Sequence, residues 1–125
     1  FLGSNHSAVF SQHAFLVYKL AIAAQNAKSI IVPAKNWGHD LQAMSEAIED
    51  DTRLIFIANP NNPTGTCVGL AEIKTFMGGI PENVLVVVDE AYFEYVDAPG
   101  YETVLGLINE HPNLLVTRTF SKAYG

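Results

Sequence analysis

The hydrophobic pattern of the chain alternates between short apolar runs and longer amphipathic stretches. The short runs are rich in Val, Ile and Leu, and continuous apolar residues are typical of strands that are buried on both faces of a sheet. The run VLVVVDE is the strongest of them. These runs predict strands at residues 8–11, 29–34, 53–58, 84–90 and 113–119.

The stretches between the apolar runs have helical character. The first is rich in Ala and Leu and contains neither Gly nor Pro. In the second, Leu41, Met44 and Ile48 fall on one helical face, and Asp40 is a plausible N-cap. Helices are predicted at residues 15–27, 40–50, 70–79 and 101–111.

Strands and helices therefore alternate along the chain from its first strand to its last. Alternating strands and helices, with strands apolar on both faces, predict an α/β fold with a mostly parallel sheet between two helical layers. The stretch NPNNPTGT (59–66) must be a loop because two Pro and a Gly interrupt it. We expect a three-layer α/β/α domain, or part of one.

Composition narrows the class of protein. Apolar residues make up 49% of the 125, which is a globular composition, and the net charge of −6 argues against binding to nucleic acid. No apolar run approaches the roughly 20 residues of a membrane span. Cys67 is the only cysteine, so no disulfide can form within the chain. We expect a cytoplasmic protein that contacts neither nucleic acid nor membrane.

Polar side chains gather where the last three predicted strands end. NPNNPTGT follows one strand, DEAY (89–92) ends the next, and RTFSK (118–122) follows the last. In open α/β sheets, ligands bind outside the carboxyl ends of the strands. These three stretches are therefore expected to meet at one crevice.

Asp89 is the first candidate for chemistry. A carboxylate at the end of so apolar a strand is costly to bury unless it is paired or hydrogen-bonded. It could cap a helix or anchor a loop, or it could face a protonated ring nitrogen or a metal ion. Asp89, Glu90 and Glu94 together could suit a hard cation, but the residues between them are equally suited to packing or π-stacking.

Lys122 is the second candidate. Loss of hydration at the end of a buried strand would free its amine as a nucleophile, although most lysines are simply solvated. Thr119 and Ser121 could hold a phosphate beside the amine with their hydroxyls. The Asn-Pro pairs fix the direction of Asn62.

Several competing motifs are absent. PTGT lacks the Gly-Lys-Ser/Thr of a nucleotide-binding phosphate loop, and no G-x-S-x-G occurs. TFSK resembles S-x-x-K, but its first residue is Thr119 and the companion motifs of penicillin-binding enzymes are missing. No two of the four His have helical i, i+4 spacing, which argues against a zinc site.

Three motifs, NPNNPTGT, VVVDEAYFEYV and TRTFSKAYG, resemble those of the fold-type I pyridoxal-phosphate aminotransferases. More narrowly, they are similar to the histidinol-phosphate aminotransferases. The resemblance implies that residues 1–125 are part of the large cofactor-binding domain of a homodimer. The N-terminal arm, the rest of that domain and the small C-terminal domain are then expected outside this segment, which alone should be inactive.

The resemblance also implies which residues bind pyridoxal 5'-phosphate. Lys122 would hold it covalently and transfer the substrate proton, Asp89 would pair with the pyridine nitrogen, and Tyr92 and Asn62 would hydrogen-bond the 3' oxygen. The remaining implied contacts are Phe15 stacked on the ring, and Thr119 and Ser121 on the phosphate.

The implied reaction is transfer of an amino group between amino acids and keto acids, one of them phosphorylated. For a histidinol-phosphate aminotransferase, imidazole-acetol phosphate and glutamate become histidinol phosphate and 2-oxoglutarate. Another fold-type I enzyme, such as an aromatic aminotransferase or a threonine-phosphate decarboxylase, is an alternative. So is an aminotransferase-like sensor domain of a transcription regulator.

Overall fold

The computed structural model describes all 125 residues and contains one five-stranded parallel sheet, in the order β2-β1-β3-β4-β5. Each neighbouring pair of strands is parallel. The prediction of a parallel sheet is confirmed, and each strand end lies within two residues of its predicted position. The strands are β1 (Ser7–Ser11), β2 (Lys28–Val32), β3 (Thr52–Ala58), β4 (Leu85–Asp89) and β5 (Leu114–Thr117).

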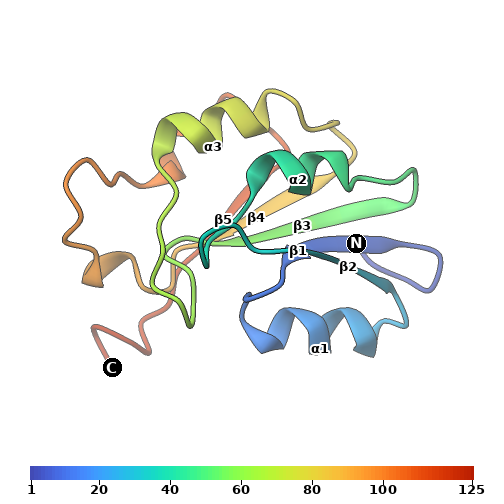
Figure 1. Ribbon diagram of the computed structural model, residues 1–125, viewed down its shortest axis with the longest axis horizontal. Coiled ribbons are helices and arrows are strands. Elements are labelled where there is room, and N and C mark those ends of the chain that lie inside the picture. The colour runs from blue at the N-terminus through green and yellow to red at the C-terminus, as the bar shows by residue number, and fades with distance from the viewer.

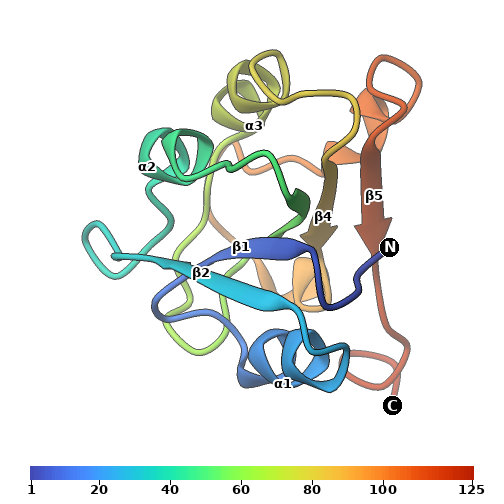
Figure 2. The same ribbon diagram turned by 90° about the vertical axis from the view of Figure 1, so that its right-hand side faces the viewer.

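Helices cover both faces of this sheet, as Figures 1 and 2 show. Helix α1 (Leu16–Ala24) lies alone on one face, whereas α2 (Leu41–Glu46) and α3 (Leu70–Met77) lie together on the other. The predicted three-layer α/β/α architecture is therefore confirmed. No helix combines the length and the apolar character that a membrane crossing requires.

Local interactions explain where the helices begin and end. The side chain of Asp40 caps α2 as predicted, because its Oδ1 accepts a hydrogen bond from the N–H of Ala43 at 3.1 Å. Helix α2 ends at Glu46, short of the predicted residue 50, since the N–H of Glu49 bonds the Thr52 hydroxyl instead of continuing the helix. Helix α1 ends before Asn26, which has a left-handed φ of 54°.

The predicted helix at residues 101–111 is wrong. This region contains only a 3₁₀ turn, η2 (Val104–Leu107), and a second unpredicted turn, η1 (Phe93–Tyr95), precedes it. The buried Glu90 carboxylate accepts the N–H of Val104, and the Thr103 hydroxyl accepts the N–H of Leu105, so these two caps fix the start of the 3₁₀ turn at Val104. Gly106 also lowers the helical propensity of the segment.

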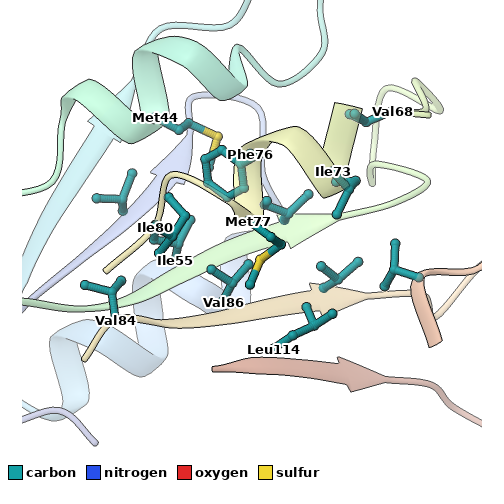
Figure 3. Close-up of a cluster of buried hydrophobic side chains, with 14 of the residues drawn as sticks. Met44, Ile55, Val68, Ile73, Phe76, Met77, Ile80, Val84, Val86 and Leu114 are labelled. Atoms are coloured by element: carbon teal, nitrogen blue, oxygen red, sulfur yellow. The ribbon is translucent and has the colours of Figure 1, made fainter. Parts of the chain in front are cut away.

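The hydrophobic core lies mainly between the sheet and the pair α2 and α3. Sixteen buried residues form this cluster, and Figure 3 shows ten of them labelled, from Met44 on α2 to Leu114 on β5. A smaller cluster of five residues lies on the opposite face, under α1. Strand β3 contributes to both clusters because its successive side chains point to opposite faces of the sheet. Ile55 belongs to the larger cluster and Leu54 to the smaller.

The parallel arrangement brings the carboxyl ends of the strands to one edge of the sheet. In Figure 1, the segments that follow β3, β4 and β5 lie at the left-hand side, and the segment that follows β1 leaves the sheet from the left end of that strand. Candidate chemistry from distant parts of the sequence can therefore meet there.

Candidate active site at the strand ends

A cavity of about 290 Å³ lies at this edge of the sheet. It is lined by residues of the segments that follow β1, β3, β4 and β5, and its size is near the lower end of the roughly 300–1,000 Å³ range of ligand sites. The structure brings together in its wall all seven residues singled out from the sequence: Phe15, Asn62, Asp89, Tyr92, Thr119, Ser121 and Lys122.

A larger hollow of about 910 Å³ lies elsewhere, between α2 and α3 and the loops beside them. None of those seven residues lines it, and the convergence of amine, carboxylate, phenol and amide is found only in the smaller cavity. The chemistry of the lining therefore identifies the smaller cavity as the candidate site.

The Asp89 carboxylate is fixed by three hydrogen bonds. Its Oδ2 accepts from the Tyr18 hydroxyl at 2.6 Å. Its Oδ1 accepts from the N–H of Ala91 at 3.1 Å and from the Thr117 hydroxyl at 3.2 Å. Asp89 thus anchors the start of its loop, and it also lines the cavity as an acceptor held in one orientation.

Two of the three asparagines in NPNNPTGT hold the loop in shape. Asn59 is buried and pairs with the backbone of Val68 through both its amide nitrogen and its oxygen. The amide of Asn61 donates to the carbonyl of His13 and to the Thr64 hydroxyl. Asn62 lines the cavity instead, which distinguishes it from its two neighbours.

Lys122 and its neighbours form the open side of the cavity. The Lys122 Nζ lies 5.5 Å from the centre of the Tyr92 ring, within reach of a cation–π contact. The hydroxyls of Thr119 and Ser121 lie 2.8 Å apart. Lys122 is exposed, so the prediction that it loses its hydration is wrong for these 125 residues. It lies beyond the end of β5, where no other element of the chain covers it.

An ion pair that the sequence did not predict lies at the cavity, with Arg118 in its wall. Glu90 is fully buried, and its carboxylate accepts from Arg118 at 2.7 and 3.0 Å and from the Thr103 hydroxyl at 2.8 and 3.0 Å. The Arg118 guanidinium also lies over the Phe93 ring at 4.0 Å. A glutamate directly after an apolar strand was the available signal, but nothing in the sequence indicated its partner.

The alternative of a hard-cation site at Asp89, Glu90 and Glu94 is not supported by the geometry. No group of three or more His, Cys, Asp or Glu side chains is placed to hold a metal ion. Instead, the two adjacent carboxylates have different environments: Glu90 is paired with Arg118, and Asp89 lines the cavity.

Tyr18 is a further residue of the site that the sequence did not predict. It lies one helical turn after Phe15, and burial together with its hydrogen bond to Asp89 raises the pKa of its phenol. The available signal was the i, i+3 spacing of two aromatic residues at the start of α1, since side chains three residues apart share a helix face.

A model of the family described as aminotransferase class I and II matches residues 3–125 of the chain. The chain belongs to this family. The family-level resemblance of its three motifs is therefore confirmed, and the strand-end cavity belongs to an aminotransferase class I and II fold.

Curated members of the family match closely in sequence. Histidinol-phosphate aminotransferase 2 of Pseudomonas fluorescens is 54% identical over 125 residues, and that of Hydrogenovibrio crunogenus is 53% identical. All of this chain is covered in both comparisons, but only 34% of each relative. The chain thus spans about a third of the length of the curated relatives it matches.

Solved structures agree with this family assignment. Histidinol-phosphate aminotransferase from Sinorhizobium meliloti, in complex with pyridoxal-5'-phosphate, superposes with a TM-score of 0.90 at 29% identity. That comparison covers 100% of this chain and 34% of the other. An aminotransferase from Mycobacterium tuberculosis, at 21% identity and a TM-score of 0.84 over 98% of this chain and 32% of its own, shares the fold.

Proposed function

We propose that this chain forms the floor of a pyridoxal-phosphate site in an aminotransferase. The convergence of Asp89, Tyr92 and Lys122 on one cavity, with the aromatic Phe15 in its wall, carries the proposal. Family membership supports it, because a matched relative is described in complex with this cofactor.

The residues of the cavity fit the chemical groups of that cofactor. A pyridinium nitrogen needs a fixed anion, and the Asp89 carboxylate is held by three donors. A planar ring needs an aromatic face, which Phe15 can offer. A phosphate needs hydroxyl donors, and Thr119 and Ser121 lie side by side at 2.8 Å.

A phenol and an amide complete the set of side chains that we propose bind the cofactor. Tyr92 and Asn62 both line the cavity and both carry hydrogen-bond donors, which suits the 3' oxygen of the cofactor. Lys122 supplies the primary amine that would attach to the aldehyde.

When bound, pyridoxal phosphate supplies an electron-deficient ring that stabilises negative charge at the α-carbon of an amino acid. Asp89 would maintain that property, because a fixed carboxylate favours the protonated, charged form of a neighbouring ring nitrogen. The Lys122 Nζ would take the proton from the α-carbon as a general base and would then donate the same proton, as a general acid, to the carbon that carried the cofactor's aldehyde oxygen.

We infer histidinol phosphate and 2-oxoglutarate, formed from imidazole-acetol phosphate and glutamate, as the products of the whole protein. The names of the relatives at 53–54% identity support this choice. We also propose that residues 1–125 are part of a larger cofactor-binding domain, that the whole protein is a homodimer and that it acts in the cytoplasm.

Covalent trapping tests the proposal directly. The full-length protein is incubated with pyridoxal phosphate, reduced with borohydride and digested, and the modified peptide is found by mass spectrometry. We expect the adduct on Lys122 and its loss in Lys122→Ala. An adduct on Lys19 or Lys35 instead, or no adduct, would contradict the proposed cofactor chemistry.

Turnover of imidazole-acetol phosphate with glutamate tests the substrate separately. An adduct on Lys122 without this turnover would retain the cofactor site and reject the substrate assignment.

A further inference from the structure

The Tyr18 side chain is held between α1 and the sheet. It is 7% exposed, and its ring stacks on that of Phe56 with centroids 4.7 Å apart and planes 9° from parallel. The Phe15 ring meets it edge-on at 5.9 Å. Contacts on two sides hold the whole side chain in place between α1 and the sheet, so packing fixes the position of its hydroxyl oxygen.

That hydroxyl points at Asp89. The Tyr18 Oη lies 2.6 Å from Asp89 Oδ2, within the 2.5–2.7 Å range of charge-assisted O–H···O⁻ bonds. Burial and the Asp89 charge raise the pKa of Tyr18, so the phenol keeps its proton and acts as the donor. The bond joins residues 71 positions apart in the sequence.

Tyr18 is the only donor on this oxygen of Asp89. The other donors, the N–H of Ala91 and the hydroxyl of Thr117, both bind Oδ1 at longer distances of 3.1 and 3.2 Å. A carboxylate has about four lone-pair sites, so three are used and one is left for a ligand. Without Tyr18, the Oδ2 end of the carboxylate would have no protein partner.

We propose that Tyr18 is the positioning residue of this site, which orients the Asp89 carboxylate for the proton on the ring nitrogen of the bound cofactor. The inference rests on the proposed function. Phe15 and Tyr18 begin the same helix, with the N–H of Tyr18 on the carbonyl of Phe15. The first turn of α1 therefore sets both the face against which the ring stacks and the direction of the carboxylate at its edge.

Tyr18→Phe tests this role because the variant retains both aromatic contacts and removes only the hydroxyl. In the full-length protein, we expect pyridoxal phosphate to bind the apo form about tenfold more weakly, which is about 1.4 kcal/mol. The absorbance band of the bound cofactor should also shift. Tyr95→Phe, which removes an exposed phenol outside the cavity, should change neither measurement.

A double-mutant cycle shows whether Tyr18 acts through Asp89. In the Asp89→Asn background, Tyr18→Phe should weaken cofactor binding less than twofold, since the charge that the phenol orients is gone. An equal loss in both backgrounds would overturn the proposal. So would a lower thermal unfolding midpoint with unchanged cofactor affinity and spectrum, because that is the result of a purely structural contact.

Replacement of Tyr18 by 3-fluorotyrosine gives a test that does not depend on the folding of Tyr18→Phe. The fluorinated phenol is nearly the same size and is a stronger donor, so the cofactor band should shift opposite to its shift in Tyr18→Phe. An unchanged band would overturn the proposal. If the proposed function itself were wrong, the wild-type protein would form no adduct on Lys122. That result can be told apart from a failure of the role proposed for Tyr18.

Discussion

Asp89 and Glu90 are adjacent acids at the end of β4 with different environments. Asp89 is the last residue of β4 and Glu90 is the first residue after it, and successive residues of an extended chain face opposite ways. Asp89 therefore lines the cavity, whereas Glu90 is fully buried against Arg118 and Thr103. One acid is available to a ligand and the other connects the loops behind it.

The Glu90–Arg118 pair predicts an asymmetric response to mutation. Arg118→Met leaves a fully buried carboxylate without its cation, which should cost about 3–5 kcal/mol of unfolding free energy. Glu90→Gln should cost less, about 1–3 kcal/mol, because the Arg118 side chain is 34% exposed and can reach water. Urea denaturation of the full-length protein measures both.

The exposed pair Lys74–Glu110 provides the matched control. Both side chains are more than half exposed, so Lys74→Met should leave the denaturation midpoint nearly unchanged. Equal losses in Arg118→Met and Glu90→Gln would show that burial of Glu90 does not govern the stability of the pair.

At the scale of helices and strands, the sequence predicted the elements whose formation depends on the pattern of neighbouring residues. The apolar runs identified all five strands, and the Asp40 cap of α2 was visible three residues before its partner Ala43. The helix predicted at 101–111 was wrong because this segment is arranged around a partner outside it, the buried Glu90, which lies 14 residues before Val104 and accepts its N–H. Tyr18 was missed for the same reason, since its partner Asp89 is 71 residues away.

His39 connects two elements, because it lies just before α2 and its Nε2–H donates to the carbonyl of Ala58 at the end of β3 at 2.8 Å. Burial lowers the pKa of His39, and the hydrogen bond offsets this only in part. As pH falls, the unfolded state therefore binds the proton first. Stability should be full above about pH 7 and fall as pH drops below about 6.5, the ordinary value of His.

Urea denaturation at pH 7.5 and 5.5 measures this loss. His39→Gln keeps a donor for Ala58 but cannot titrate, so its stability should change less between the two pH values than that of the wild type. The same pH dependence in both proteins would assign the loss to other groups.

At the scale of the whole molecule, the two faces of the sheet are covered unequally. Helices α2 and α3 cover a core of sixteen residues, whereas α1 alone covers the other face (Figure 2). Leu16 and Leu20 on α1 and Leu115 on β5 are exposed. Leu16 and Leu20 are four residues apart and therefore share one face of α1, where they form an exposed apolar surface. The curated relatives are about three times as long as this chain.

Residues 1–125 expressed alone should therefore self-associate. Light scattering should show species larger than 13.6 kDa, and a hydrophobic dye should bind. The double variant Leu16→Lys, Leu20→Glu should reduce both signals, whereas Lys19→Ala on the same helix should not. A monomer at high concentration without dye binding would contradict this expectation.

The three asparagines of NPNNPTGT have one further consequence, which concerns how related proteins are interpreted. Asn59 and Asn61 maintain the shape of a loop, and Asn62 alone among them faces the cavity. A homologue could thus keep the first two amides and the fold while it loses Asn62 and the chemistry. In a survey of such sequences, the motif as a whole reports ancestry. If Asn62 and Lys122 have the roles proposed above, positions 62 and 122 together should distinguish enzymes from proteins that retain only their shape.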